Sequence, residues 1–158
     1  KQVYCGAYEG LDVWLKKRAE NPYAINPCLK FGASVEEVRQ HVAANEESWV
    51  NYGMSYNEEM NKWEDDFFIG TNAMIYLYDT EDGKNMSYVI YIHEGSLSYE
   101  VMQHELEKMR YTYKGIIKSP MYPDEQFLMY LSEDGETEAQ IMLNHLYPWQ
   151  VSFQPTDH

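Results

Sequence analysis

The chain has 158 residues, 44% of them hydrophobic, and a formal net charge of −14. Its length and apolar content predict a single globular domain with its own core and exclude an intrinsically disordered chain. The negative charge argues against nucleic acid and anionic membrane surfaces as partners, because both attract basic patches. The sequence contains no apolar run of the roughly 18 residues that a membrane-spanning helix needs.

The N-terminal part of the chain is predicted to form a helix followed by a linker. The helix covers residues 8–20, where Leu11 and Leu15 lie on one side. The following Asn21-Pro22 pair ends it, because the residue before a proline disfavours helical geometry.

Two cysteines, Cys5 and Cys28, flank this helix and are predicted to form a disulfide. An oxidised pair is typical of an extracytoplasmic protein, whereas two buried thiols would serve as small apolar side chains. The sequence starts at Lys1 without a methionine, which is compatible with a removed signal or a trimmed N-terminus. We therefore expect a periplasmic, cell-surface or secreted protein, with room for a lipid tether outside the given sequence.

A capping box predicts the next helix, over residues 34–45. Ser34 and Glu37 have the spacing at which each side chain bonds a backbone N–H at the helix start. The apolar stripe of this helix consists of Val35, Val38 and Val42.

Alternating apolar residues predict a strand over 48–54 and a hairpin over 73–78 and 86–93. The hairpin turn is Glu81-Asp82-Gly83, because Asp-Gly between apolar runs is a strong turn signal. The acidic stretch 57–66 is predicted to be a loop or a short surface helix. It is not predicted to bind calcium, because the spaced carboxylates of a calcium loop are missing.

The second half of the chain repeats the order of helix, strand and hairpin. Its predicted elements are a helix over 98–110, a strand over 111–117, a hairpin over 126–131 and 138–145 around Glu133-Asp134-Gly135, and a last strand over 149–154.

The two halves therefore look like copies of one unit. Glu133 follows Glu81 by 52 residues and Ser98 follows Ser34 by 64, so the hairpins and the helices align at different offsets. The sequence predicts one α+β domain of two tandem helix–strand–hairpin units, with helices packed on antiparallel sheet and superposable Asp-Gly turns. The expected division is an N-terminal helix and linker over 1–30, one unit over 31–93 and another over 94–158.

The helix motif Gly-x-Ser/Thr-x-x-x-Val also carries a family resemblance. Gly32, Ser34 and Val38 match it, and the order of elements over residues 29–155 is similar to the β-lactamase-inhibitor-like fold. Small outer-membrane assembly lipoproteins of the SmpA type carry a similar single unit. The resemblance implies a helix-plus-sheet fold in a small secreted bacterial protein, and it implies no activity.

Histidines are the first candidates for catalysis or metal binding. His41 and His104 lie on predicted helices, and His93 and His145 lie at strand ends, where a pseudo-twofold axis would bring them together. The alternative is that all four are structural or surface residues. His104-Glu105 lacks the second histidine of a zinc-protease motif, and nucleophile elbows and phosphate loops are absent. The sequence therefore predicts no catalytic residue, no metal site and no cofactor.

The aromatic content is high, with 15 tyrosines and 4 tryptophans. Because strand side chains alternate between faces, the hairpins have one aliphatic and one tyrosine-bearing face. The face predicted to pack on the helices comprises Ile75, Leu77, Phe127 and Met129. The face predicted to be accessible for binding comprises Tyr76, Tyr78 and Tyr130. The alternative is that these tyrosines complete a two-sided core.

These patterns predict a non-enzymatic extracytoplasmic module that binds a protein or glycan partner. Tyrosine-rich surfaces favour recognition, since the ring offers a large contact area at low entropy cost. One alternative is a cell-envelope hydrolase with a site between the two repeats, for which a concave pocket with converging histidine and carboxylate groups is expected. Another is a glycan-binding domain that uses exposed aromatic side chains.

Overall fold

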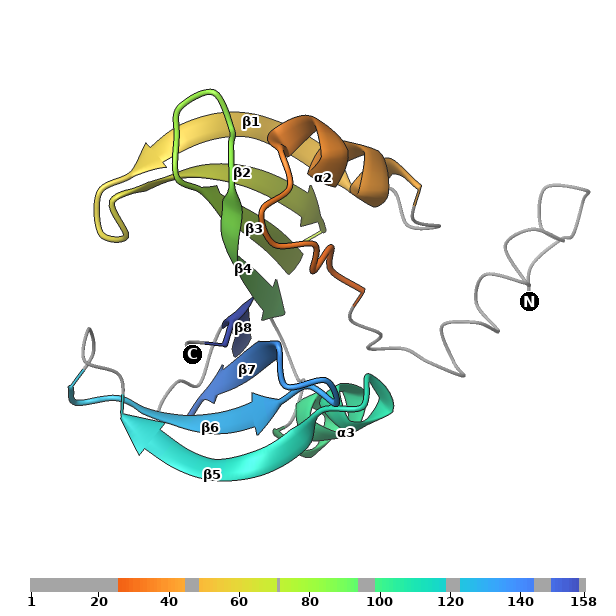
Figure 1. Cartoon of the computed structure of the whole chain (residues 1–158), viewed down its shortest axis with the longest axis vertical. Helices are drawn as coiled ribbons and strands as arrows, with labels where there is room; N and C mark the ends of the chain where they lie inside the picture. Colours follow the sequence, from red (N-terminus) through yellow and green to blue (C-terminus); the bar gives the residue numbers. More distant parts are fainter. Residues whose placement is uncertain are drawn as a thin grey trace, which may run out of the picture.

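The computed structural model describes residues 26–44, 49–70, 72–93, 99–118, 123–143 and 149–156. In this part of the chain, two helices accompany one open antiparallel sheet of eight strands, so the α+β class is confirmed (Figure 1). The predicted helix over 8–20 lies outside the described residues.

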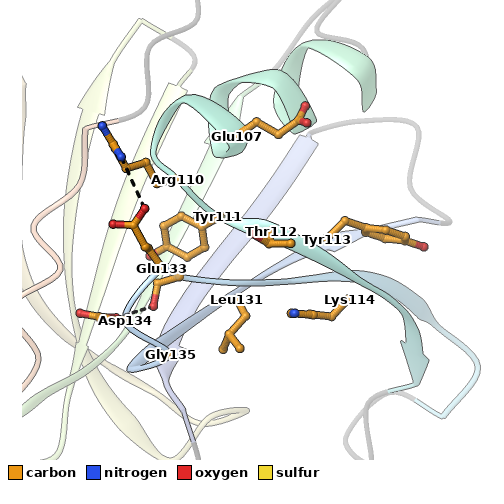
Figure 2. A pocket seen from close by; sticks show the side chains of 11 residues that line it. Glu107, Arg110, Tyr111, Thr112, Tyr113, Lys114, Leu131, Glu133, Asp134 and Gly135 are labelled. Carbon is orange, nitrogen blue, oxygen red and sulfur yellow. Dashed lines mark hydrogen bonds and ion pairs between the residues drawn. The ribbon is translucent and has the colours of Figure 1, made fainter.

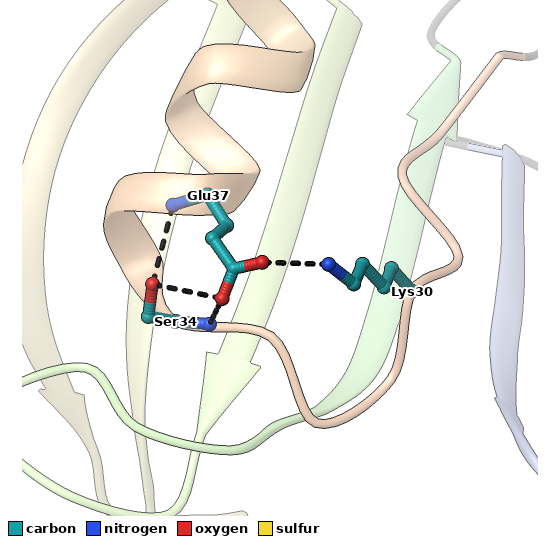
Figure 3. Close-up of polar contacts among 3 residues, drawn as sticks. All are labelled: Lys30, Ser34 and Glu37. Carbon is teal, nitrogen blue, oxygen red and sulfur yellow. Dashed lines mark hydrogen bonds and ion pairs between the residues drawn. The ribbon is translucent and has the colours of Figure 1, made fainter.

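The first described helix, α2 (Val35–Ala43), begins with the predicted capping box (Figure 3). The Ser34 hydroxyl accepts a hydrogen bond from the Glu37 backbone N–H at 3.3 Å, and the Glu37 carboxylate accepts one from the Ser34 backbone N–H at 3.3 Å. The Lys30 ammonium donates to the same carboxylate at 2.7 Å. The hydrogen bond from Lys30, followed by that from the Ser34 backbone, lowers the pKa of Glu37.

Four strands follow α2, and one of them contradicts the sequence prediction. They are β1 (Val50–Asn57), β2 (Lys62–Ile69), β3 (Asn72–Tyr78) and β4 (Met86–His93). The acidic stretch predicted to be a loop or short helix forms most of β2. The side chains of this stretch alternate between the two faces of a strand, with Trp63, Asp65 and Phe67 on one face. Because acidic residues occur on both faces, the apolar pattern that usually indicates a strand is missing.

The second half has the same order of elements, close to the predicted bounds. They are α3 (Tyr99–Lys108), β5 (Thr112–Lys118), β6 (Gln126–Leu131), β7 (Thr137–Met142) and β8 (Trp149–Pro155).

The eight strands pair in the order β1-β2-β3-β4-β8-β7-β6-β5. The last strand, β8, therefore lies at the centre beside β4, where Val89 pairs with Phe153 and Tyr91 with Val151. Strands β1 and β5 form the two edges of the sheet, at opposite ends of the molecule in Figure 1.

The two Asp-Gly turns do not occupy equivalent places, which corrects the alignment of the hairpins. The turn at Gly83 joins the third and fourth strands of its half, whereas the turn at Gly135 joins the second and third. Their local geometry is alike, with φ of 76° and 75°, because the same turn residues were used in both. The alignment was wrong because β2 was not predicted as a strand, so the first half was assigned one strand too few.

Both helices pack on the same face of the sheet, because their buried residues belong to one apolar cluster. This core joins Val38 and Val42 of α2, Met102 and Leu106 of α3, and Phe153 of the central strand. One row of cross-strand neighbours that faces it is Asp65, Tyr76, Val89, Phe153, Ala139 and Tyr130.

The prediction of an accessible tyrosine face is wrong. Tyr76 and Tyr78 are 0% exposed and Tyr130 is 3% exposed, and all three belong to the core beneath the helices. Large rings fit there because the facing stripe of α2 consists of small valines. The Tyr76 hydroxyl accepts a hydrogen bond from the Cys28 backbone N–H at 2.9 Å, so its polar end is satisfied at the margin of the core.

The aliphatic residues predicted to face the helices lie on the opposite side of the sheet, which we call the open face. There Leu77 and Phe127 are buried, whereas Ile75 and Met129 are half-buried. A row across this face runs through Asp66, Ile75, Ile90, Ser152, Gln140 and Met129.

Candidate functional site

A groove of about 750 Å³ lies where α3 ends, β5 begins and the β6–β7 turn approaches (Figure 2). Its walls carry charges of both signs. The residues that line it are Glu107, Arg110, Tyr111, Thr112, Tyr113, Lys114, Leu131, Ser132, Glu133, Asp134 and Gly135.

The end of α3 fixes one wall of the groove. The Tyr111 N–H bonds the Leu106 carbonyl at 3.0 Å, and the Arg110 N–H bonds the Glu107 carbonyl at 2.9 Å. This pair of bonds is the Schellman motif, in which glycine usually takes the left-handed position. Here Arg110 takes it, with φ of 67°. Arg110 therefore lines the groove although its left-handed backbone conformation is unfavourable for any residue with a side chain.

The charged groups of the groove form an exposed ion pair at the end of α3 and hydrogen bonds at the β6–β7 turn. Arg110 approaches Glu133 at 3.4 Å, and their side chains are 77% and 72% exposed, so this pair contributes little stability. At the turn, a hydrogen bond from the Glu136 backbone and another from Ser132 lower the pKa of Asp134. Figure 2 shows Arg110 and Glu133 pointing toward each other across one end of the groove.

Tyr111 forms the floor between this groove and the core. It is 6% exposed, and its ring meets that of Phe153 at 5.9 Å. Burial raises the pKa of Tyr111 to about 12, so the phenol stays neutral at physiological pH. The groove thus combines a buried aromatic floor with exposed ionic groups, an arrangement suited to binding a charged chain.

Exposed apolar side chains gather at the two sheet edges. Within the described residues, all five large hydrophobic side chains that are exposed lie on β1 or β5. They are Val50, Tyr52 and Tyr56 on β1 and Tyr113 and Ile116 on β5.

The open face is a third candidate surface, because no described helix covers it. Its half-buried apolar residues are Phe68, Ile75, Tyr88, Ile90, Ile92, Met129 and Leu131. Polar side chains lie between them on the central strands, where Gln140 and Gln154 both donate to the Glu138 carboxylate.

Beneath α2, an ion pair between Arg39 and the buried Asp65 connects the helix to β2. Asp65 is 0% exposed and accepts hydrogen bonds from Arg39 Nε at 2.9 Å and Nη2 at 2.8 Å. Asn51 donates to the same carboxylate at 3.1 Å. The bidentate geometry and the third donor satisfy the buried charge, so this cluster holds α2 and β1 against β2.

The next residue along β2, Asp66, lies on the open face and has another carboxyl group as its neighbour instead of a cation. Asp66 lies beside Glu64, and burial, followed by a hydrogen bond with Glu64, raises the pKa of Asp66 to about 8. Its Oδ1 atom is buried and has no hydrogen-bond partner among the described residues. The surroundings of Asp66 therefore favour its neutral form.

The residues that the sequence suggested do not converge. Tyr76, Tyr78 and Tyr130 lie in the core. Cys28 is buried and forms no disulfide with a described residue, and Cys5 lies outside the described residues, so their disulfide stays a prediction.

The histidines that the structure describes do not come together either. His41 and His104 are exposed on separate helices. His145 lies outside the described residues, and the side chain of His93 is likewise not described. In the described part of the chain, no three histidine, cysteine or acidic side chains form a group that could hold a metal ion.

Sequence reasoning missed the groove, the ion pair and the carboxyl pair. The sequence did hold a signal for the ion pair and the carboxyl pair. The neighbouring residues Asp65 and Asp66 must point to opposite faces if residues 62–69 form a strand. The groove had no such signal, because its walls come from the end of a helix and a turn more than twenty residues later.

The chain matches no protein-family model, no curated protein and no solved structure. None of the described helices is long and apolar enough to cross a membrane.

Proposed function

We propose that the protein is a non-enzymatic interaction module that binds another protein through the open face of its sheet. The observation that carries this proposal is the row of half-buried apolar side chains on that face, where no described helix covers them. Apolar residues left partly accessible together are typical of recognition surfaces.

The distribution of side chains on the open face supports a protein partner. Ile75 and Ile90 are cross-strand neighbours on one side of the centre, and Met129 lies on the other. Between them, Ser152 and Gln140 offer hydrogen bonds. The apolar side chains of a protein partner would complement this face better than the many hydroxyl groups of a glycan.

We also propose that the two halves arose by duplication and align strand for strand, which places β1 with β5 and β4 with β8. Two glycines support this alignment, since Gly53 and Gly115 each lie at a β-bulge in the first strand, with φ of 82° and 125°. They are 62 residues apart, close to the 64 residues between Val35 and Tyr99, where the helices begin. The resemblance to the β-lactamase-inhibitor-like fold and a location outside the cytoplasm belong to the same proposal.

Site-specific photocrosslinking tests the binding face. A photoreactive phenylalanine analogue at position 75 or 90 should label one defined protein in an envelope extract, and the same analogue at Glu36, exposed on α2, should not. Replacing Ile90 by Asp should then abolish labelling from position 75. Equal labelling from all three positions, or binding to purified glycans without any protein partner, would reject the proposal.

A further inference from the structure

Strand β5 has an unusual charge for this molecule. The chain has 12 basic and 26 acidic residues, yet β5 carries Lys114 and Lys118 and no acidic residue. It is the one strand with a net positive charge among those described. Neither lysine forms an ion pair with a described residue, and both are exposed.

The same strand is open for pairing. It bonds only β6 in the sheet, so the backbone N–H and C=O groups along its outer edge have no strand partner among the described residues. Tyr113 is 48% exposed and Ile116 is 56% exposed on this edge. A Cβ built on Gly115 would meet nothing within 4 Å, so another backbone can approach there.

The groove continues this edge at its N-terminal end. Thr112, Tyr113 and Lys114 belong to both the strand and the groove wall. Arg110 adds a third cation beside them, and its exposed contact with Glu133 at 3.4 Å is weak enough to be exchanged for another carboxylate.

We propose that the β5 edge binds an extended acidic segment of a partner by strand addition, with one end of that segment in the groove. Backbone hydrogen bonds to the edge supply affinity, and alternate side chains supply specificity. The apolar positions of the segment would contact Tyr113 and Ile116, and its carboxylates would pair with Lys114, Lys118 and Arg110. This surface is separate from the open face, so either proposal can fail alone.

A second copy of the chain is a poor occupant of this edge. If two β5 strands paired antiparallel about Ile116, Lys114 of one copy would lie opposite Lys118 of the other. Like charges directly opposite each other destabilise a strand pair. The same lysines therefore discourage self-association and favour an acidic partner.

The test is a selection from displayed random peptides about ten residues long, with the full chain as bait. The wild-type protein should enrich peptides that combine Asp or Glu with apolar residues. Changing Lys114→Glu or Lys118→Glu should weaken the best peptide about tenfold or more, whereas Lys84→Glu, which reverses an exposed charge on a turn of the other half, should not. Selection of basic peptides, or of none, would overturn the proposal.

Two further measurements separate strand addition from simple charge attraction. Binding of the selected peptide should slow amide hydrogen exchange along β5 and leave β1 unchanged. Arg110→Gly should weaken the peptide several-fold while the midpoint of unfolding stays equal or rises, because glycine suits the left-handed position. Peptide binding without protection of β5, or unaffected by Arg110→Gly and both lysine changes, would reject the proposed mode.

Discussion

Gly83 is under a constraint that the other described glycines do not share. A Cβ at this position would lie 2.4 Å from a methyl carbon of Val35 at the start of α2. The Gly83 carbonyl also accepts a hydrogen bond from the Val35 N–H at 2.8 Å, so the turn completes the first turn of the helix. The turn and the helix start are therefore held as one unit.

We expect Gly83→Ala to be far more damaging than Gly135→Ala. Both glycines have left-handed φ, which costs an alanine about 1–2 kcal/mol. Only Gly83 adds a steric clash, worth about a further 1–3 kcal/mol, because nothing lies within 4 Å of a Cβ at Gly135. Urea denaturation of the two variants measures the difference, and equal losses would show that the close contact with Val35 is not maintained.

The raised pKa of Asp66 predicts a pH dependence of stability. Its folded value of about 8 lies above an ordinary unfolded value of about 4, so the folded state binds the proton more tightly. This contribution is fully present below pH ~4 and is lost as the pH rises through about 8. Asp66→Asn should flatten the melting temperature between pH 5 and 8, approximately the window between these two values.

The exposed Asp82 provides the control for that experiment. Its pKa is lowered, first by a hydrogen bond with Thr80, so it is ionised throughout this pH range. Asp82→Asn should leave the slope of the melting temperature unchanged. If Asp66→Asn behaved in the same way, Asp66 would be ionised in the folded protein at neutral pH.

At the scale of elements, the Arg39–Asp65 pair decides how firmly α2 is attached to the sheet. Arg39→Met leaves a fully buried carboxylate with only Asn51 as donor, which should cost about 3–5 kcal/mol. The double change Arg39→Met with Asp65→Leu should cost less, because it removes the stranded charge. Arg110→Met is the matched control at the exposed pair with Glu133 and should cost less than about 1 kcal/mol.

Some elements could be predicted from the sequence because the residues that determine them are close together in the chain. The capping box and the Asp-Gly turns were predictable because their geometry depends on residues within a few positions of each other. Strand β2 was not predictable, since its buried Asp65 is stabilised by Arg39, which lies 26 residues away in the sequence. The orientation of Tyr76 also depended on the size of distant helix residues, which alternation alone does not reveal.

For the whole molecule, the pairing of β4 with β8 predicts cooperative unfolding. One core contains residues of both halves, and Phe153 lies in it at 0% exposure. Phe153→Ala should therefore cost about 3–5 kcal/mol and lower hydrogen-exchange protection equally in α2 and α3. A loss of protection confined to α3 would show that the halves unfold separately.

The central position of β8 has a consequence for synthesis of the chain. Strand β4 ends at His93 and β8 begins at Trp149, 56 residues later (149 − 93 = 56). At ~5–20 residues per second, the ribosome needs roughly 3–11 s to make that stretch. During this interval the inner edge of β4, which carries Val89 and Tyr91, has no native partner. A nascent chain stalled before β8 should therefore recruit chaperones that the finished protein no longer binds.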